Sequence, residues 1–233
     1  MQKVILFICI VFCLVHEGWG QNKSIDSLRI GYDKLYGLDV ILTNGKKYIP
    51  NSTPVIGHPF WKSQDSFSGN ITISGKTFEH QQLKYDLNKQ QFVLFYSNYN
   101  GQPGQIILNN TSIDSVSIGK CLFIPNKYPQ ISQPFVQLVY QGHLPCYIGW
   151  YKELNYSTLG RVGFEYSKDC SIYYLAYKGS VYRFRNRSSF LRIFNLNERV
   201  SIRKYFSSNG LIFKKMNEND LRKLISFCEQ TLI

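Results

Sequence analysis

The feature that most constrains the fold is a long succession of short segments in which apolar and polar residues alternate. From about residue 39 to residue 185 these segments are rich in Tyr, Phe, Val and Ile, and turn residues separate them. Alternation with a period of two is typical of half-buried β-strands. Three tight hairpins are predicted, with turns at Asn44-Gly45, Gly75-Lys76 and Asn88-Lys89. Consecutive hairpins form an antiparallel meander.

More strands are predicted along the rest of this region, at residues 105–108, 115–124, 135–140, 147–154, 161–166, 172–177 and 181–184. A sheet of ten or more strands must curl into a barrel or split into a sandwich. The expected fold class is therefore α+β, with an antiparallel β domain over residues 21–185.

The spacing of apolar residues changes to a helical period near residue 186. Helices are predicted over 186–196, over 198–206 and near the C-terminus, where Leu221, Leu224, Ile225, Cys228 and Leu232 share one face. Residues 183–223 hold eleven Lys or Arg against three acidic residues, a net charge of +8. About three basic helices, over residues 186–233, are thus expected to pack their apolar stripes on the sheet.

The N-terminus has the pattern of a secretory leader. Lys3 precedes an unbroken apolar run over residues 4–15, and small residues follow at the positions that a signal peptidase reads. A spanning helix needs about 20 apolar residues, so no transmembrane segment is expected after cleavage. The sequence predicts a signal peptide over residues 1–20, cleavage before Gln21, and a secreted or periplasmic protein.

Lipid attachment at Cys13 is an alternative end to this leader. A small residue is expected before a lipidated cysteine, and Phe12 stands there instead. Simple cleavage is therefore favoured over a lipoprotein.

The basic balance of the chain, +12 overall, suggests an anionic envelope component as partner, such as an acidic glycan, lipopolysaccharide or phospholipid head groups. Another protein is the alternative partner, and nucleic acid is disfavoured. Ordinary solvated helix surfaces also account for these charges, and more simply. The candidate binding residues in this region are Arg183, Arg185, Arg187, Arg203 and Lys204.

Gly57-His-Pro-Phe-Trp is the most distinctive short segment, and it adds His58 and Trp61 to the candidate binding residues. Such a loop can form the lip of a binding site. It can equally be a structural plug, with its large aromatics buried and His58 bonded to a buried carbonyl. The plug is favoured because bulky aromatic side chains usually belong to the core.

Four cysteines remain after cleavage, and one disulfide is expected among Cys121, Cys146 and Cys170. Cys228 lies on the apolar face of the last predicted helix, where it fits as a small buried hydrophobe. Neither the histidines nor the cysteines have the spacing of a metal site, so no metal and no cofactor are predicted.

The common catalytic motifs are absent, so no catalytic residue is predicted and a noncatalytic binding protein is favoured. One alternative is an enzyme acting on a glycan or lipid through a dispersed site that uses His58 or His80 with Asp86. A second alternative is a carrier that holds a small apolar ligand inside a β-barrel.

Several segments together resemble a family of uncharacterised secreted proteins of Bacteroidota. They are Asn44-Gly-Lys-Lys-Tyr-Ile-Pro, Gly57-His-Pro-Phe-Trp, residues 69–95, Val181-Tyr-Arg-Phe, Arg203-Lys-Tyr-Phe and Leu211-Ile-Phe-Lys-Lys. The resemblance covers most of the chain after the leader. It implies a periplasmic or surface setting in a bacterium, and it implies no catalytic residue.

Overall fold

The computed structural model describes residue 31 and residues 39–51, 54–98, 100–157 and 163–232. The predicted signal peptide over residues 1–20, its cleavage site and Cys13 therefore lie outside the described residues. Within the part of the chain that is described, no helix is both long enough and apolar enough to span a membrane.

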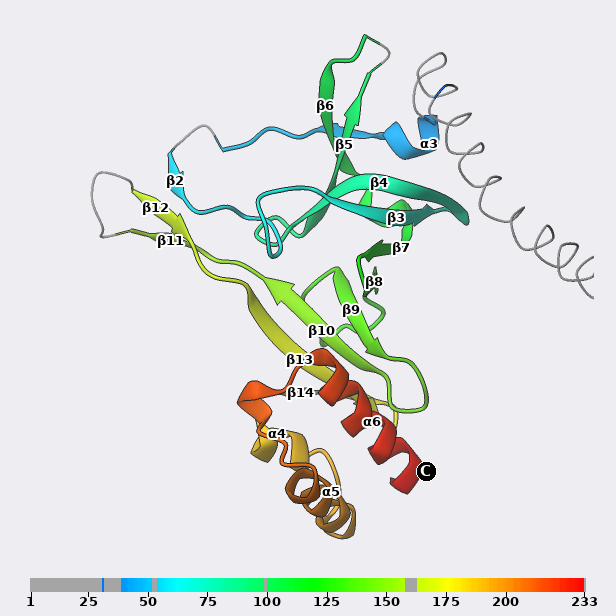
Figure 1. Cartoon of the computed structure of the whole chain (residues 1–233), viewed down its shortest axis with the longest axis vertical. Helices are drawn as coiled ribbons and strands as arrows, with labels where there is room; N and C mark the ends of the chain where they lie inside the picture. The colour runs from blue at the N-terminus through cyan, green and yellow to red at the C-terminus, as the bar shows by residue number, and fades with distance from the viewer. Residues whose placement is uncertain (1–30, 32–38, 52–53, 99, 158–162, 233) are drawn as a thin grey trace, which may run out of the picture.

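Most of the described chain forms one antiparallel sheet of eleven strands (Figure 1). In order across the sheet the strands are β1 (Gly45–Lys47), β6 (Pro103–Leu108), β5 (Gln91–Ser97), β4 (Lys76–Asp86), β3 (Phe67–Ile73), β7 (Ile113–Ile118), β8 (Cys121–Pro125), β9 (Phe135–Tyr140), β10 (Cys146–Tyr151), β13 (Cys170–Tyr177) and β14 (Ser180–Phe184). In this order β1 and β14 are separate edges. Of the two expected forms, barrel or sandwich, the barrel is therefore wrong, because the sheet does not close.

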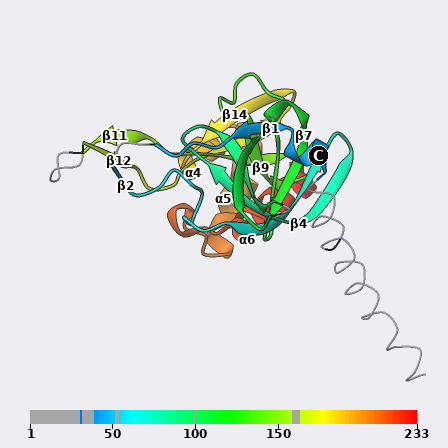
Figure 2. The same ribbon diagram turned by 90° about the horizontal axis from the view of Figure 1, so that it is seen from above.

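The first part of the sheet nevertheless folds over itself (Figure 2). Phe92 on β5 and Phe135 on β9 are separated by four strands in the sheet order, yet their ring centroids are 5.0 Å apart. Phe123 on β8 lies 5.8 Å from Phe92 across the same interior. We call β1 and β3 to β8 the curled half. Its facing layers are closer to a sandwich than to a barrel.

The second part, which we call the helix-covered half, consists of β9, β10, β13 and β14 with three helices packed on one face (Figure 1). These helices are α4 (Arg187–Leu191), α5 (Leu196–Ser208) and α6 (Glu218–Leu232), with the 3-10 turn η2 (Phe213–Lys215) between the last two. Their apolar residues share one core cluster with the strands. Asn186 and Asn195 begin α4 and α5 with capping boxes, which satisfy the free N–H groups of the first turn.

The three predicted C-terminal helices are present at the expected positions, but the total number of helices and the charge of the last helix differ from the prediction. The described residues hold four α-helices, because α3 (Val40–Thr43) precedes the sheet. The helix α6 is not basic, since Glu218, Asp220 and Glu229 outnumber Arg222 and Lys223.

The first predicted hairpin, at Asn44-Gly45, is wrong. The Asp39 carboxylate accepts the backbone N–H of Ile41 at 2.8 Å and begins the short helix α3. The residues after it form β1, which pairs with β6 about sixty residues away. A Cβ on Gly45 would lie 2.1 Å from the carbonyl oxygen of Ile107. This glycine therefore permits a close strand approach and does not form a turn.

The other two predicted hairpins are confirmed as β3–β4 and β4–β5, although the first turn lies one residue earlier than predicted, at Ser74-Gly75. Ser74 and Gly75 form the first turn with φ values of 49° and 79°, as a tight two-residue turn requires. In the second turn the Asp86 carboxylate accepts the N–H groups of Asn88 at 3.0 Å and Lys89 at 2.8 Å. Turn chemistry within a few residues fixes both hairpins.

Two of the longer predicted strands are each interrupted. The segment 115–124 is split into β7 and β8 by a turn at Gly119. The segment 147–154 ends at Tyr151, and the chain then leaves the main sheet. A small sheet of β11 (Leu154–Tyr156), β12 (Phe164–Tyr166) and β2 (Val55–Ile56) projects to one side of the molecule (Figures 1 and 2). The remaining short element is the 3-10 turn η1 (Asn110–Ser112).

Candidate functional site

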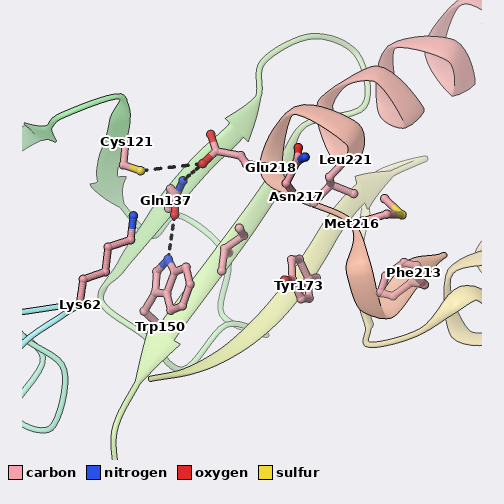
Figure 3. A pocket seen from close by; sticks show the side chains of 11 residues that line it. Lys62, Cys121, Gln137, Trp150, Tyr173, Phe213, Met216, Asn217, Glu218 and Leu221 are labelled. Atoms are coloured by element: carbon pink, nitrogen blue, oxygen red, sulfur yellow. Dashed lines mark hydrogen bonds between the residues drawn. The ribbon is translucent and has the colours of Figure 1, made fainter. Parts of the chain in front are cut away.

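A cavity of 210 Å³ lies where the two halves of the sheet meet the start of α6 (Figure 3). Apolar side chains form most of its wall, namely Ile148, Trp150, Tyr173, Phe213, Met216 and Leu221. Polar side chains complete it, namely Lys62, Cys121, Gln137, Asn217 and Glu218. An apolar hollow with a few convergent polar groups is the usual form of a small-ligand site.

The apolar wall joins strands to the segment between α5 and α6. Trp150 on β10 packs against the core clusters of both halves. Tyr173 lies on the neighbouring strand β13, and its ring centroid is 6.3 Å from that of Phe213 in η2, at an interplanar angle of 78°. This edge-to-face contact is favourable between aromatic rings, so it holds η2 against the sheet.

A chain of hydrogen bonds connects the polar side of the cavity (Figure 3). Trp150 Nε1 donates to Gln137 Oε1 at 2.8 Å, and Gln137 Nε2 donates to Glu218 Oε2 at 2.7 Å. Gln137 is buried, and a buried amide without partners would be costly. The chain therefore fixes the start of α6 to β9 and β10.

Both carboxylate oxygens of Glu218 are already occupied. Besides Gln137, the Cys121 thiol donates to Oε2 at 3.8 Å, and Arg222 Nη2 donates to Oε1 at 2.9 Å as an i,i+4 ion pair. Burial and the neighbouring Glu218 carboxylate raise the pKa of the Cys121 thiol above its usual range. A protonated thiol is a poor nucleophile, so Cys121 is not activated as one.

Lys62 supplies the positive charge at the rim of the cavity. Its φ of 58° lies in the left-handed region, which is unfavourable for a residue with a side chain. The Asp169 carboxylate accepts its backbone N–H at 2.8 Å. The Lys62 ammonium lies 4.1 Å from the Trp61 ring centroid, and no described carboxylate forms an ion pair with it.

An ion pair between Lys152 and Asp169 fixes the loop that carries Lys62. The buried Lys152 ammonium lies 3.1 Å from Asp169 Oδ1 and donates to the carbonyl oxygen of His58 at 2.9 Å. Asp169 therefore holds both Lys152 and the backbone of Lys62. As a result, the segment from His58 to Lys62 is held firmly between the cavity and the rest of the sheet.

Of the two binding residues predicted in this loop, Trp61 is buried and His58 is only partly covered. Trp61 is 3% exposed, and its ring meets Phe123 edge-on at 5.2 Å. Trp61 thus belongs to the core, as the plug interpretation expects, and the expectation that it contacts a ligand at the surface is wrong. The buried Nδ1 of His58 has no hydrogen-bond partner, while the imidazole interacts with the backbone of the buried Phe60.

His58 lines a different hollow, of 350 Å³, together with Tyr48, Lys84 and Tyr166. The Lys84 ammonium lies over two phenyl rings there, 4.6 Å from the Phe60 centroid and 4.3 Å from the Phe95 centroid. Burial, and then the Lys152 charge, lower the pKa of His58. His58 is therefore in its neutral form near pH 7.

Of the dispersed catalytic set that was considered in the sequence, the pair of His80 with Asp86 is not assembled. His80 is an exposed residue of β4 and lies six positions before Asp86 on the same strand, a separation of about 20 Å. Asp86 is fully buried and accepts the turn N–H groups described above. Its role is structural.

The five predicted basic residues do not form one site. Arg183 pairs across β13–β14 with Tyr174, on the sheet face away from the helices. Arg187 lies on the helical side, where its Nη2 donates to the carbonyl oxygen of Arg203 at 3.4 Å. Lys204 is exposed beside Arg203 on α5, and Arg185 is exposed in the link between β14 and α4.

The disulfide expected among Cys121, Cys146 and Cys170 is not formed, and all three are free thiols. Cys146 and Cys170 lie at opposite ends of the β10–β13 pair, five residues apart in register. That is about 17 Å along a strand, whereas bridged cysteines have Cα atoms within about 7 Å of each other.

The sequence interpretation missed the residues that shape the cavity. Lys62 directly follows the Gly57–Trp61 segment, so its place next to an aromatic loop was the one available signal. Gln137 and Glu218 are 81 residues apart in the chain, and neither belongs to a motif.

Comparisons of the chain with protein-family models, with characterised proteins and with solved structures gave no match. The geometry of the cavity and of the surface is therefore the basis for any functional conclusion.

Proposed function

We propose that this protein is a noncatalytic binding protein that holds a small amphiphilic carboxylate in the cavity between β10, β13 and α6. The observation that carries the proposal is the Lys62 ammonium, which has no ion-pair partner among the described carboxylates and lies at the rim of an apolar hollow. The apolar body of the ligand lies against Trp150, Tyr173 and Phe213, and its carboxylate faces Lys62.

The charges around the cavity favour an anionic ligand over a cationic one. Glu218 is the acidic residue of the lining, and Arg222 and Gln137 already neutralise and bond it. Asn217 and Glu218 also belong to the start of α6, and the N-terminal end of a helix favours negative charge. A ligand cation would therefore find no free carboxylate.

The volume of the cavity supports a small ligand. Pockets for drug-sized molecules enclose about 300–1,000 Å³, and this cavity encloses 210 Å³. A phenylpropionate or a short fatty acid such as hexanoate is in the suitable size range. The proposal keeps a carrier-like role for the protein but moves the ligand out of a barrel interior and into the junction of sheet and helices.

Isothermal titration of the purified chain with phenylpropionate, hexanoate and their neutral amides tests this function. We expect the acids to bind more tightly than the amides. We expect Lys62→Gln to weaken binding of the acids about tenfold, which corresponds to loss of one charge-assisted hydrogen bond at a partly exposed site. Phe213→Ala should weaken the binding of acids and amides alike, because it removes an apolar contact with both.

Lys46→Gln is the matched control, since it removes the same charge from an exposed position on β1. The control should bind like the native chain. Equal affinity for acids and amides, an equal loss in the control, or no binding of either ligand class would overturn the proposed function.

We further propose that the chain is exported with cleavage before Gln21 and belongs to the Bacteroidota family that it resembles, as a periplasmic or secreted protein. The leader pattern around Lys3 and the apolar run over residues 4–15 support this. The intact mass of protein recovered outside the cytoplasm of a bacterial host should match a chain that begins at Gln21. A mass that retains residues 1–20, or a lipid on Cys13, contradicts it.

A further inference from the structure

We propose that the outward face of α5 docks on an anionic lipid surface. In this arrangement Leu196 and Val200 enter between the lipid head groups, and Arg203 and Lys204 lie against the phosphates. This inference does not depend on the cavity or on its ligand.

The first observation is an apolar pair on the solvent side of an otherwise anchored helix. The helix α5 buries Ile202 and Phe206 in the core cluster. On the opposite side Leu196 is 75% exposed and Val200 is 65% exposed. Residues four apart in a helix are neighbours on its surface, so these two side chains form one exposed apolar stripe.

The second observation is that basic residues continue this stripe. Arg203 and Lys204 follow Val200 by three and four positions, so they share its side of the helix, and both are exposed. The Arg187 guanidinium lies beside them, donating to the carbonyl oxygen of Arg203 and standing 5.0 Å from the Phe206 ring centroid. Apolar and basic side chains thus occur together on one outward face.

The third observation is that the acidic residue of α5 is not available to offset these charges. Glu198 Oε1 accepts the Tyr177 hydroxyl at 2.7 Å and lies 3.5 Å from the Lys178 ammonium. Its Oε2 accepts the N–H of Asn195 at 2.8 Å, within the capping box of the helix. The outward face therefore keeps its full positive charge.

These features together favour a lipid surface over other anionic partners. A helix with an exposed apolar stripe and a basic border lies well at the boundary between head groups and acyl chains. A purely electrostatic partner, such as an acidic glycan, would make no use of Leu196 and Val200. Because the helix is 13 residues long and inserts two side chains, the docking is expected to be weak, reversible and sensitive to salt.

Co-sedimentation of the full purified chain with phosphatidylcholine vesicles, with and without about one third phosphatidylglycerol, tests the proposal. We expect binding to the anionic vesicles alone, and loss of that binding at high salt. Arg203→Gln with Lys204→Gln should weaken binding more than tenfold, at about fivefold for each charge near the surface. Leu196→Ser with Val200→Ser should weaken it at unchanged net charge.

Lys46→Gln with Lys47→Gln is the control pair, since it removes the same charge from β1, at the other edge of the sheet. The control should keep nearly native binding. The α5 positions are exposed, so thermal melts of all variants should agree with the native chain. An equal loss in the control pair, full binding by the Leu196 and Val200 variant, or no binding to anionic vesicles would overturn the proposal.

Discussion

The curled half and the helix-covered half bury their apolar side chains in different ways. The curled half folds one sheet over itself, so rings from distant strands, such as Phe92 and Phe123, meet in its interior. The helix-covered half leaves its strands open and covers one face with α4, α5 and α6. The two halves meet at a joint where the sheet contacts the start of α6. The cavity occurs at that joint, next to Trp150, which packs against both halves.

The largest expected effect concerns the curled half. Phe123→Ala removes a fully buried ring that contacts Trp61, Tyr85 and Phe92, and it should lower the free energy of unfolding by about 3–5 kcal/mol. Urea unfolding measures the change. Leu122→Ala on the same strand, at a position 36% exposed, is the control and should lose far less. A small loss for Phe123→Ala would mean that the ring cluster does not support the curled half.

The next largest effect on stability concerns the joint where β9 and β10 meet the start of α6. Gln137→Leu removes the amide that bonds both Trp150 and Glu218 and leaves the half-buried indole N–H and carboxylate without that partner. We expect a loss of about 2 kcal/mol in the free energy of unfolding.

Hydrogen exchange should locate the effect of Gln137→Leu. The backbone N–H groups in the first turns of α6 should exchange faster, while those of β3 and β4 stay protected. A uniform loss of protection across both halves would contradict this prediction, because the effect of Gln137→Leu would then not be confined to the start of α6.

The smallest effect concerns the far end of α6, where Glu229 holds the turn between β9 and β10. The hydrogen bond from Tyr140, followed by those from the N–H groups of His143 and Leu144, lowers the pKa of Glu229. A Cβ on Gly142 would lie 2.5 Å from the Glu229 carboxylate, so the turn and the carboxylate fit closely.

A carboxyl whose pKa is lowered by folding stabilises the fold above its ordinary pKa, and this contribution is lost as the pH falls through that range. Glu229→Gln should therefore be less stable than the native chain at pH 7, and the difference should shrink below about pH 4.5. Thermal melts across pH 3–8 measure it, with Gln230→Glu as a control on the next, exposed position. A constant difference at every pH would show that the Glu229 charge is not involved.

The elements that were predicted correctly depend on short-range chemistry. Ser74 and Gly75 set the β3–β4 turn by their own backbone conformation, and β9 was predicted with the bounds Phe135–Tyr140 that it has. Asn44-Gly45 has the same local appearance, yet the chain there pairs with β6, because β1 gains a distant partner that the local pattern cannot reveal. The candidate site was harder to predict from the sequence for the same reason. Its residues Lys62, Gln137 and Glu218 come from three distant segments of the chain.

The sequence by itself determined the mainly antiparallel strand content and the change to helices after residue 185. Side-chain periodicity and turn residues act within a few positions, so both can be seen without tertiary structure. Tertiary structure alone decided that the sheet curls without closing and that the cysteines stay apart. These outcomes depend on which distant strands and helices pack together, and that choice depends on the burial of the whole molecule. The unpaired Lys62 at the cavity and the basic, apolar face of α5 follow from that packing.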